Sequence, residues 1–376
     1  MTWPLRAELD GDNTRLVDRL CTVALEGLPR MYRPDSDEFA FTRARSTSGE
    51  LELRGTSTRY AAIVALGAQW LPEEKQRAVL GGMNVEEFVA LLVSRLDRTT
   101  NLGDAGLIAW AAAQSAHPLL PKALERLREL DDPNKPQYVV EASWVVAALA
   151  SSIGQAEVKD HLAAARERLL VSRHGNSPLF PHGTGPGLLP WYRSHVACYA
   201  DQVYPIQALA ILHRMRGDEE AKTAAVRAAD RICELQGPGG QWWWHYDART
   251  GGLVEGYPVY TVHQASMGPM ALLDLTDAGG PSYREAIERG LRWITDPAEH
   301  RGHETEPIVH DADGVTWRKI YRGDPKKVVR AVQGLTTKAV PGLHMPGIDA
   351  AYKPFALDRE CRPYEFGWLL YAWLAR

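Results

Sequence analysis

The sequence alternates between two kinds of helix-forming stretch along most of its length, and this alternation is its strongest constraint on the fold. In the first kind, apolar residues recur at helical spacing opposite a charged face, which is typical of a helix that lies on a surface. In the second kind, the central turns carry almost no charge, so the helix must be enclosed by protein on most sides. Each surface helix is followed by an enclosed one, which is the order expected of stacked helical hairpins.

The positions of both kinds of helix follow from this pattern. Amphipathic helices are expected at residues 14–28, 85–98, 118–130, 155–172, 219–236 and 282–295. Apolar helices are expected at residues 56–71, 103–114, 139–151, 199–215, 258–275 and 363–375. A linear stack of about six hairpins would leave an apolar face open at each end, whereas a closed ring leaves none. We therefore predict an all-α fold, an (α/α)6 toroid, as a single domain over residues 1–376 in preference to two helical bundles.

Residues 296–360 do not follow the alternation. They contain Pro, Gly and short β-prone stretches, and they exceed the length of an ordinary loop. We expect an irregular flap or a small hairpin across one mouth of the ring. The segment also contains residues of metal-binding type, namely His300, His303, Glu304, His310 and Asp311. Their spacing matches no standard zinc site, so the sequence predicts neither a metal nor another cofactor.

Composition limits the function classes. The net charge of −4 provides no basic field that would favour nucleic acid. No apolar run is long enough to span a bilayer, and residues 1–20 lack the layout of a signal peptide, so a cytoplasmic protein is expected. The isolated cysteines, Cys21, Cys198, Cys233 and Cys361, indicate reduced thiols. Trp and Tyr greatly outnumber Phe, which suits the wall of a cavity for a small molecule or an oligosaccharide.

Polar residues gather at the starts of the apolar helices, whose N-terminal dipoles would converge on one mouth of a ring. The candidate catalytic residues are Asp104, Glu141, Asp201, His263 and Glu365. The candidate substrate-binding residues at the same helix starts are Trp144, Tyr204, Tyr257, Tyr260, Gln264 and Arg362. Trp243, from an aromatic run, and Trp317 and Arg322, from the flap, complete the set.

Each candidate also has a purely structural interpretation. Asp104 and Asp201 could be helix N-caps, and His263 could be a hydrogen-bonded core histidine. Glu141 and Glu365 lie on otherwise apolar helices, where a carboxylate must be paired or have a raised pKa. A raised carboxyl pKa is what a general acid needs. Alternatively, Arg59 or Arg362 would neutralise these carboxylates in structural ion pairs.

One unit carries a family resemblance. Gln236, Gly240 and Trp242 form a Q-x-x-x-G-x-W unit at the end of an amphipathic helix and before an apolar one. In this unit the chain resembles the squalene-cyclase-like and prenyltransferase-like α/α toroids of the terpenoid cyclase superfamily. The resemblance implies a structural role for these residues in tying neighbouring hairpins together. The chain departs from the cyclase acid motif D-x-D-D, for which Asp35-Ser36-Asp37-Glu38 is the nearest match, and it has no Asp-x-Cys pair of the prenyltransferase type.

Two enzyme classes fit these observations. The resemblance implies a terpene-cyclase-like enzyme, in which a buried carboxylic acid protonates an isoprenoid without a metal and aromatic faces stabilise the carbocations. The alternative is a carbohydrate-active enzyme, because similar toroids serve glycosidases, polysaccharide lyases and uronate epimerases. Paired carboxylates would then perform hydrolysis, or Tyr257 and His263 would act as lyase acid and base. The cyclase is the preferred hypothesis, and a non-catalytic binding scaffold is a third.

Overall fold

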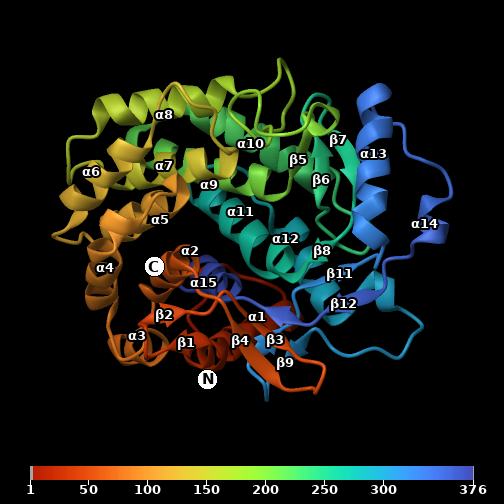
Figure 1. Ribbon diagram of the computed structural model, residues 1–376, viewed down its shortest axis with the longest axis horizontal. Helices are drawn as coiled ribbons and strands as arrows, with labels where there is room; N and C mark the ends of the chain where they lie inside the picture. Colours follow the sequence, from red (N-terminus) through yellow and green to blue (C-terminus); the bar gives the residue numbers. More distant parts are fainter. Residues whose placement is uncertain (1–2, 376) are drawn as a thin grey trace.

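The computed structural model describes residues 3–375, and its helices form two concentric rings (Figure 1). Within these residues, the inner ring consists of α2 (Thr58–Ala68), α5 (Leu102–Gln114), α7 (Val139–Ser151), α9 (Ala200–Arg216), α11 (Gly268–Asp277) and α15 (Pro363–Trp373). The outer ring consists of α1 (Gly11–Gly27), α4 (Val85–Ser94), α6 (Leu120–Leu130), α8 (Lys159–Val171), α10 (Glu219–Glu234) and α12 (Arg284–Thr295). Each inner helix contacts the next one along the chain, and α15 contacts both α11 and α2. The ring is therefore closed, and the predicted (α/α)6 toroid is confirmed.

The helices of the inner ring are more deeply buried than those of the outer ring, as the sequence pattern predicts. The inner helix α5 buries ten of its 13 residues, whereas its outer neighbour α6 buries four of 11. The buried positions of α6 are Leu120, Ala123, Leu124 and Leu127, a single stripe at helical spacing. Each leucine of this stripe contributes about 1.5–3 kcal/mol through the area that it removes from water. The apolar helices lie inside because only there is their whole circumference covered.

The helices α2 and α15, which close the ring, cross at two glycines. A Cβ atom placed on Gly67 would lie 2.1 Å from the carbonyl oxygen of Gly367. A Cβ atom placed on Gly367 would lie 2.7 Å from the carbonyl oxygen of Ile63. The two backbones therefore touch directly, and neither position has room for a side chain.

The Q-x-x-x-G-x-W unit connects α10 to α12. The Gln236 side-chain amide donates to the carbonyl oxygens of Gly240, at 2.8 Å, and of Ala286 in α12, at 2.9 Å. Gly240 has a φ of 92°, and a side chain there would collide with the carbonyl of Arg289. Trp242 is fully buried. These contacts give all three residues a structural role at the junction of neighbouring hairpins.

The strands are short and form five small antiparallel sheets within the described residues. Up to residue 198 they are β1 (Tyr32–Arg33), β2 (Glu38–Phe39), β3 (Thr42–Arg45), β4 (Leu51–Arg54) and β5 (Val196–Cys198). Next come β6 (His245–Asp247), β7 (Gly252–Glu255), β8 (Val259–Tyr260), β9 (Val309–His310), β10 (Val315–Thr316), β11 (Lys319–Tyr321), β12 (Ala356–Asp358) and β13 (Glu360–Cys361). Many of them directly precede an inner helix: β4 leads to α2, β5 to α9, β8 towards α11 and β13 to α15. The sheets therefore stand where the inner helices begin.

Residues 296–360 contain more regular structure than the irregular flap expected from the sequence. Besides β9 to β12 they include the helices α13 (Val328–Ala339) and α14 (Ile348–Ala351). The remaining short helix, α3 (Glu73–Val79), lies between α2 and α4 in the chain. The strand β11 pairs with both β12 and β8, and this pairing fixes the segment to the start of an inner helix. The flap therefore reaches the mouth of the ring through a sheet.

Several helix bounds differ from the prediction by a few residues, and at one apolar helix the expected first turn is not helical. The helix expected from residue 258 begins at Thr261, with a π-helical turn over His263–Met267 before α11. Val259 and Tyr260 belong to β8 instead, and they pair with Ile320 and Lys319 of the flap. β-branched and aromatic residues favour a strand when a partner strand is present, and the sequence does not reveal that partner. No helix within residues 3–375 is both long and apolar enough to cross a membrane.

Candidate functional site

A cavity of about 700 Å³ lies next to β8, the strand that precedes α11. Its walls come mainly from β8, β11 and the start of α13, and they include the rings of Trp244 and Tyr260. Its basic lining residues are Arg318, Lys319, Arg322, Lys326, Lys327 and Arg330, and its acidic ones are Glu255, Asp324 and Asp358. The excess of cations and the aromatic rings suit a ligand that carries both negative charge and an apolar face.

Glu365 is a buried carboxyl group that does not line this cavity but lies beside Arg318, which does. It lies in the first turn of α15 and is 3% exposed, and neither of its carboxyl oxygens has a hydrogen-bond partner among the described residues. Burial raises its pKa to about 8, although Arg318 and Arg362 act in the opposite direction. The nearest charge is the Arg318 Nε atom, at 3.8 Å from Glu365 Oε1. The group is therefore mostly protonated at neutral pH, as a general acid must be.

Two arginines of the cavity lack a close acidic partner. The contacts of Arg318 with Asp358 and Glu360 are 3.9 and 3.6 Å long. The Nε atoms of Arg318 and Arg330 have no hydrogen-bond partner in the described part of the chain. Arg318 also lies 5.1 Å from the centroid of the Tyr260 ring. These guanidinium groups are available to an anionic ligand, in contrast to Arg322, which is bonded to Glu255 at 3.0 Å.

Arg59 joins two candidate carboxylates at the starts of the inner helices α5 and α7. Its Nε atom donates to Asp104 at 2.8 Å, and its Nη2 atom donates to Glu141 at 3.2 Å. Asp104 is not the N-cap of α5, because Asn101 occupies that position and accepts from the Asp104 amide. The cluster combines the first turns of three neighbouring inner helices. It remains partly exposed, with 14% of the Glu141 side chain accessible.

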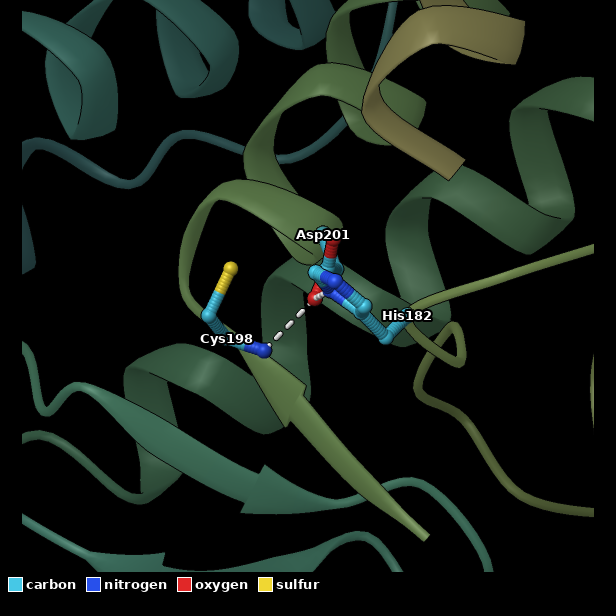
Figure 2. Close-up of side chains that lie close together, drawn as sticks. All are labelled: His182, Cys198 and Asp201. Atoms are coloured by element: carbon cyan, nitrogen blue, oxygen red, sulfur yellow. Dashed lines mark hydrogen bonds and ion pairs between the residues drawn. The ribbon is translucent and has the colours of Figure 1, made fainter. Parts of the chain in front are cut away.

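Asp201 lies in the first turn of α9 and is fully buried. Its Oδ2 atom accepts from the backbone amide of Cys198 at 2.6 Å and lies 2.9 Å from the His182 Nδ1 atom. The N-cap of α9 is Tyr199, so Asp201 is not a simple cap. The Asp201 carboxylate raises the pKa of His182, although burial opposes this effect. Figure 2 shows the three side chains together at the end of β5.

His263 is enclosed by aromatic rings. The Trp244 ring stacks on it at 5.6 Å, and the rings of Tyr199 and Tyr260 lie at 4.5 and 4.9 Å. Burial lowers its pKa to about 3, so the imidazole is neutral at neutral pH. A neutral imidazole with so low a pKa is a weak base and cannot serve as an acid. These contacts favour a role for His263 in supporting the cavity wall.

The candidate binding residues divide into two groups. Trp144, Tyr204, Tyr260 and Arg362 lie at the mouth: Trp144 faces Arg59 and Tyr204, and Arg362 donates to the Tyr60 hydroxyl at 3.1 Å.

The second group makes contacts within the protein. Gln264 accepts from the Trp242 amide at 3.2 Å, and the buried Trp317 donates to Glu306 at 3.0 Å. Trp243 packs edge-on against Tyr257, whose hydroxyl donates to Glu299 at 2.9 Å. Tyr257 and Arg322 also line the cavity, but their polar atoms are already bonded.

The sequence interpretation did not identify His182, Cys198, Arg318 or Arg330 as members of the site. Arg318 lies in the flap beside the candidate Trp317, and His182 lies in a Gly/Pro-rich loop without periodicity. Their positions depend on strand pairing between distant segments, for example β11 with β8. A search for His, Cys and Asp residues near helix starts would have found Cys198 but not His182, which lies 18 residues before α9.

Comparison with known proteins places the chain by its fold. No protein-family model and no curated protein sequence matches it. An unsaturated glucuronyl hydrolase specific for heparin is similar in structure, with a TM-score of 0.58, 12% identity and 95% of both chains covered. A glycosaminoglycan-degrading unsaturated glucuronyl hydrolase from Bacillus sp. GL1 has a TM-score of 0.59 and 13% identity, covering 96% of this chain and 95% of that one. A glycosyl hydrolase of family 88 from Bacteroides vulgatus has a TM-score of 0.56 and 12% identity, covering 97% and 98%.

These likenesses correct the family expected from the sequence. The resemblance to terpenoid cyclases is wrong, because the similar solved structures are glucuronyl hydrolases with an (α/α)6 fold. Cyclisation of an isoprenoid, the preferred hypothesis, is likewise wrong. The Q-x-x-x-G-x-W unit therefore has a structural role in joining two hairpins, and its presence does not indicate which reaction the protein catalyses. At this level of identity the comparison establishes the fold, and chemistry has to be argued from the site.

Proposed function

We propose that the protein is a glycoside hydrolase that removes a terminal uronate from an acidic oligosaccharide. The observation that carries the proposal is Glu365, a carboxyl group with a pKa of about 8 beside a cavity rich in cations. Hydrolysis needs a proton donor for the sugar, and a group that is protonated at neutral pH can supply it. The structural neighbours, described as unsaturated glucuronyl hydrolases, support the same class of substrate.

Glu365 acts as the general acid in this proposal. In an ordinary uronide it protonates the glycosidic oxygen, and in an unsaturated uronide it protonates the electron-rich carbon of the enol ether. Glu141, paired with Arg59 across the mouth, is the carboxylate that accepts a proton from the attacking water. Asp104 shares the same arginine and fixes its orientation.

Substrate binding follows from the charges of the cavity. Arg318 and Arg330 bind the uronate carboxylate, because each has guanidinium N–H groups without a close partner. Trp244 and Tyr260 offer ring faces to the sugar. A neutral sugar would leave both arginines without a counter-charge, so the site discriminates against it.

The proposal is tested with three kinds of substrate: unsaturated uronyl disaccharides, saturated uronides and neutral glycosides. Hydrolysis of an unsaturated uronide is followed through loss of the ultraviolet absorbance of its conjugated double bond, and the other two through release of the aglycone. We expect turnover of uronides and none of neutral glycosides. Activity confined to neutral glycosides, or absence of glycosidase activity with all three kinds, would refute the proposal.

Arg330→Gln is expected to raise KM for the uronide about tenfold, with a smaller effect on kcat. The expected cost is about 1.5 kcal/mol, the value of one charge-assisted hydrogen bond. Steady-state kinetics with the same uronide measure both parameters. The control is Arg214→Gln on α9, an exposed arginine near the far end of that helix. Equal KM values for the wild-type protein and the Arg330 variant would show that this arginine does not bind the substrate.

A further inference from the structure

His182, Cys198 and Asp201 come together although no motif in the sequence joins them. One potential ligand atom from each residue lies within 4.8 Å of the other two. His182 belongs to the loop before β5, Cys198 ends β5, and Asp201 is in the first turn of α9. In Figure 2 the Asp201 carboxylate lies between the thiol and the imidazole. The grouping follows from the sharp turn between β5 and α9, which brings positions 198 and 201 close together.

The spacing is close to that of a metal site. Zinc bonds of about 2.0–2.3 Å in a tetrahedron put the ligand atoms roughly 3.5 Å apart. The ligand atoms of the three residues are at most 4.8 Å apart, and small side-chain rotations would bring them to about 3.5 Å. The 2.9 Å distance between His182 and Asp201 would increase slightly.

An unsatisfied atom points to a missing ligand. Asp201 is 0% exposed, and its Oδ1 atom has no hydrogen-bond partner within residues 3–375. A buried carboxylate oxygen without a partner is costly, and a cation would remove that cost. The Cys198 thiol lies beside it and is half-buried. A thiolate can form there only if a positive charge compensates it.

We propose that His182, Cys198 and Asp201 bind a divalent cation of the zinc type at the start of α9. A thiolate, an imidazole and a carboxylate together favour zinc over calcium or magnesium, which prefer oxygen ligands. The His182 side chain is 28% exposed, so a fourth position on this side is open to water. The inference is independent of the proposed hydrolase function, because it rests on ligand geometry and not on Glu365.

Binding has a defined proton balance. The Cys198 thiol loses its proton to solvent when the sulfur–metal bond forms, and a protonated His182 loses one as well. Metal binding requires these ligands to be deprotonated, so protons compete with the metal as the pH falls. Affinity is therefore expected to rise with pH across the neutral range.

The experiment uses the full chain, treated with a chelator and then titrated with Zn²⁺ by calorimetry and with Co²⁺ by absorbance. We expect one equivalent of metal and a thiolate-to-cobalt charge-transfer band. Cys198→Ser should abolish the band and weaken Zn²⁺ binding by more than about 100-fold, since a direct ligand contributes more than a second-shell group. Cys233→Ser is the matched control, because Cys233 is also a half-buried free thiol but lies outside the cluster.

A second measurement covers the case in which Cys198→Ser does not fold. In the wild-type protein, Zn²⁺ should slow alkylation of Cys198, read by peptide mass spectrometry, and leave alkylation of Cys233 unchanged. Absence of stoichiometric metal binding, an unaltered cobalt band in Cys198→Ser, or equal alkylation rates with and without Zn²⁺ would overturn the proposal. None of these readouts depends on hydrolase activity, so they separate the metal site from the proposed function.

Discussion

Glu365→Gln is expected to lower kcat for the uronide by about 10²–10⁴-fold, the usual contribution of a positioned general acid. Glutamine has nearly the same shape but carries no proton that it can donate. In the wild-type protein, kcat should decrease as the pH rises through about 8, because the carboxyl group then loses its proton. Steady-state rates across this range measure both effects. The matched control is Glu285→Gln, an exposed glutamate in the first turn of the outer helix α12.

The same substitution has a consequence for stability, and its sign follows from the direction of the shift. Burial raises the pKa of Glu365 from 4.5 to about 8, so the folded state holds this proton more tightly than the unfolded state. The contribution of Glu365 to the free energy of unfolding therefore falls as the pH rises between these values, by up to about 1.4 kcal/mol per pH unit. Glu365→Gln should lack this dependence. Unchanged kcat in a folded variant would exclude Glu365 as the acid, whatever its effect on stability.

The fold was readable from the sequence because it depends on a repeated local property. Whether a helix is apolar all round or on one stripe is decided by its own residues, and a closed ring is the arrangement that buries both kinds. The polar residues at the inner helix starts were found for the same reason. Glu365, Glu141 and Asp201 each stand at a helix start whose position the pattern already gives.

The remainder of the site depends on contacts between distant segments. Arg318 reaches Glu365 because β11 pairs with β8, and no local pattern predicts that pairing. The β8 strand itself was mistaken for the first turn of a helix. The family was wrong for a related reason: Gln236, Gly240 and Trp242 satisfy a packing requirement at a helix junction, and packing requirements are shared by enzymes with different chemistry.

Ring closure at α2 and α15 leads to the largest expected effect on stability. Gly67→Ala should destabilise the protein by about 3 kcal/mol, at the upper end of the usual cost of overpacking. The new Cβ atom would lie 2.1 Å from the Gly367 carbonyl oxygen, so the two helices would have to separate. This cost exceeds the gain of about 1 kcal/mol from replacing glycine by alanine in a helix. The free energy of unfolding in urea measures the difference.

Gly106→Ala is the matched control, since Gly106 also lies inside an inner helix, α5. The nearest atoms to its new Cβ atom would be at 3.5 Å, which is an ordinary contact. The substitution then changes stability only through the higher helix propensity of alanine. The variant should be as stable as the wild-type protein or up to about 1 kcal/mol more stable. The two Gly→Ala substitutions should therefore change the free energy of unfolding in opposite directions. If Gly67→Ala were neutral as well, α2 and α15 would not be in backbone contact and the ring would close in another way.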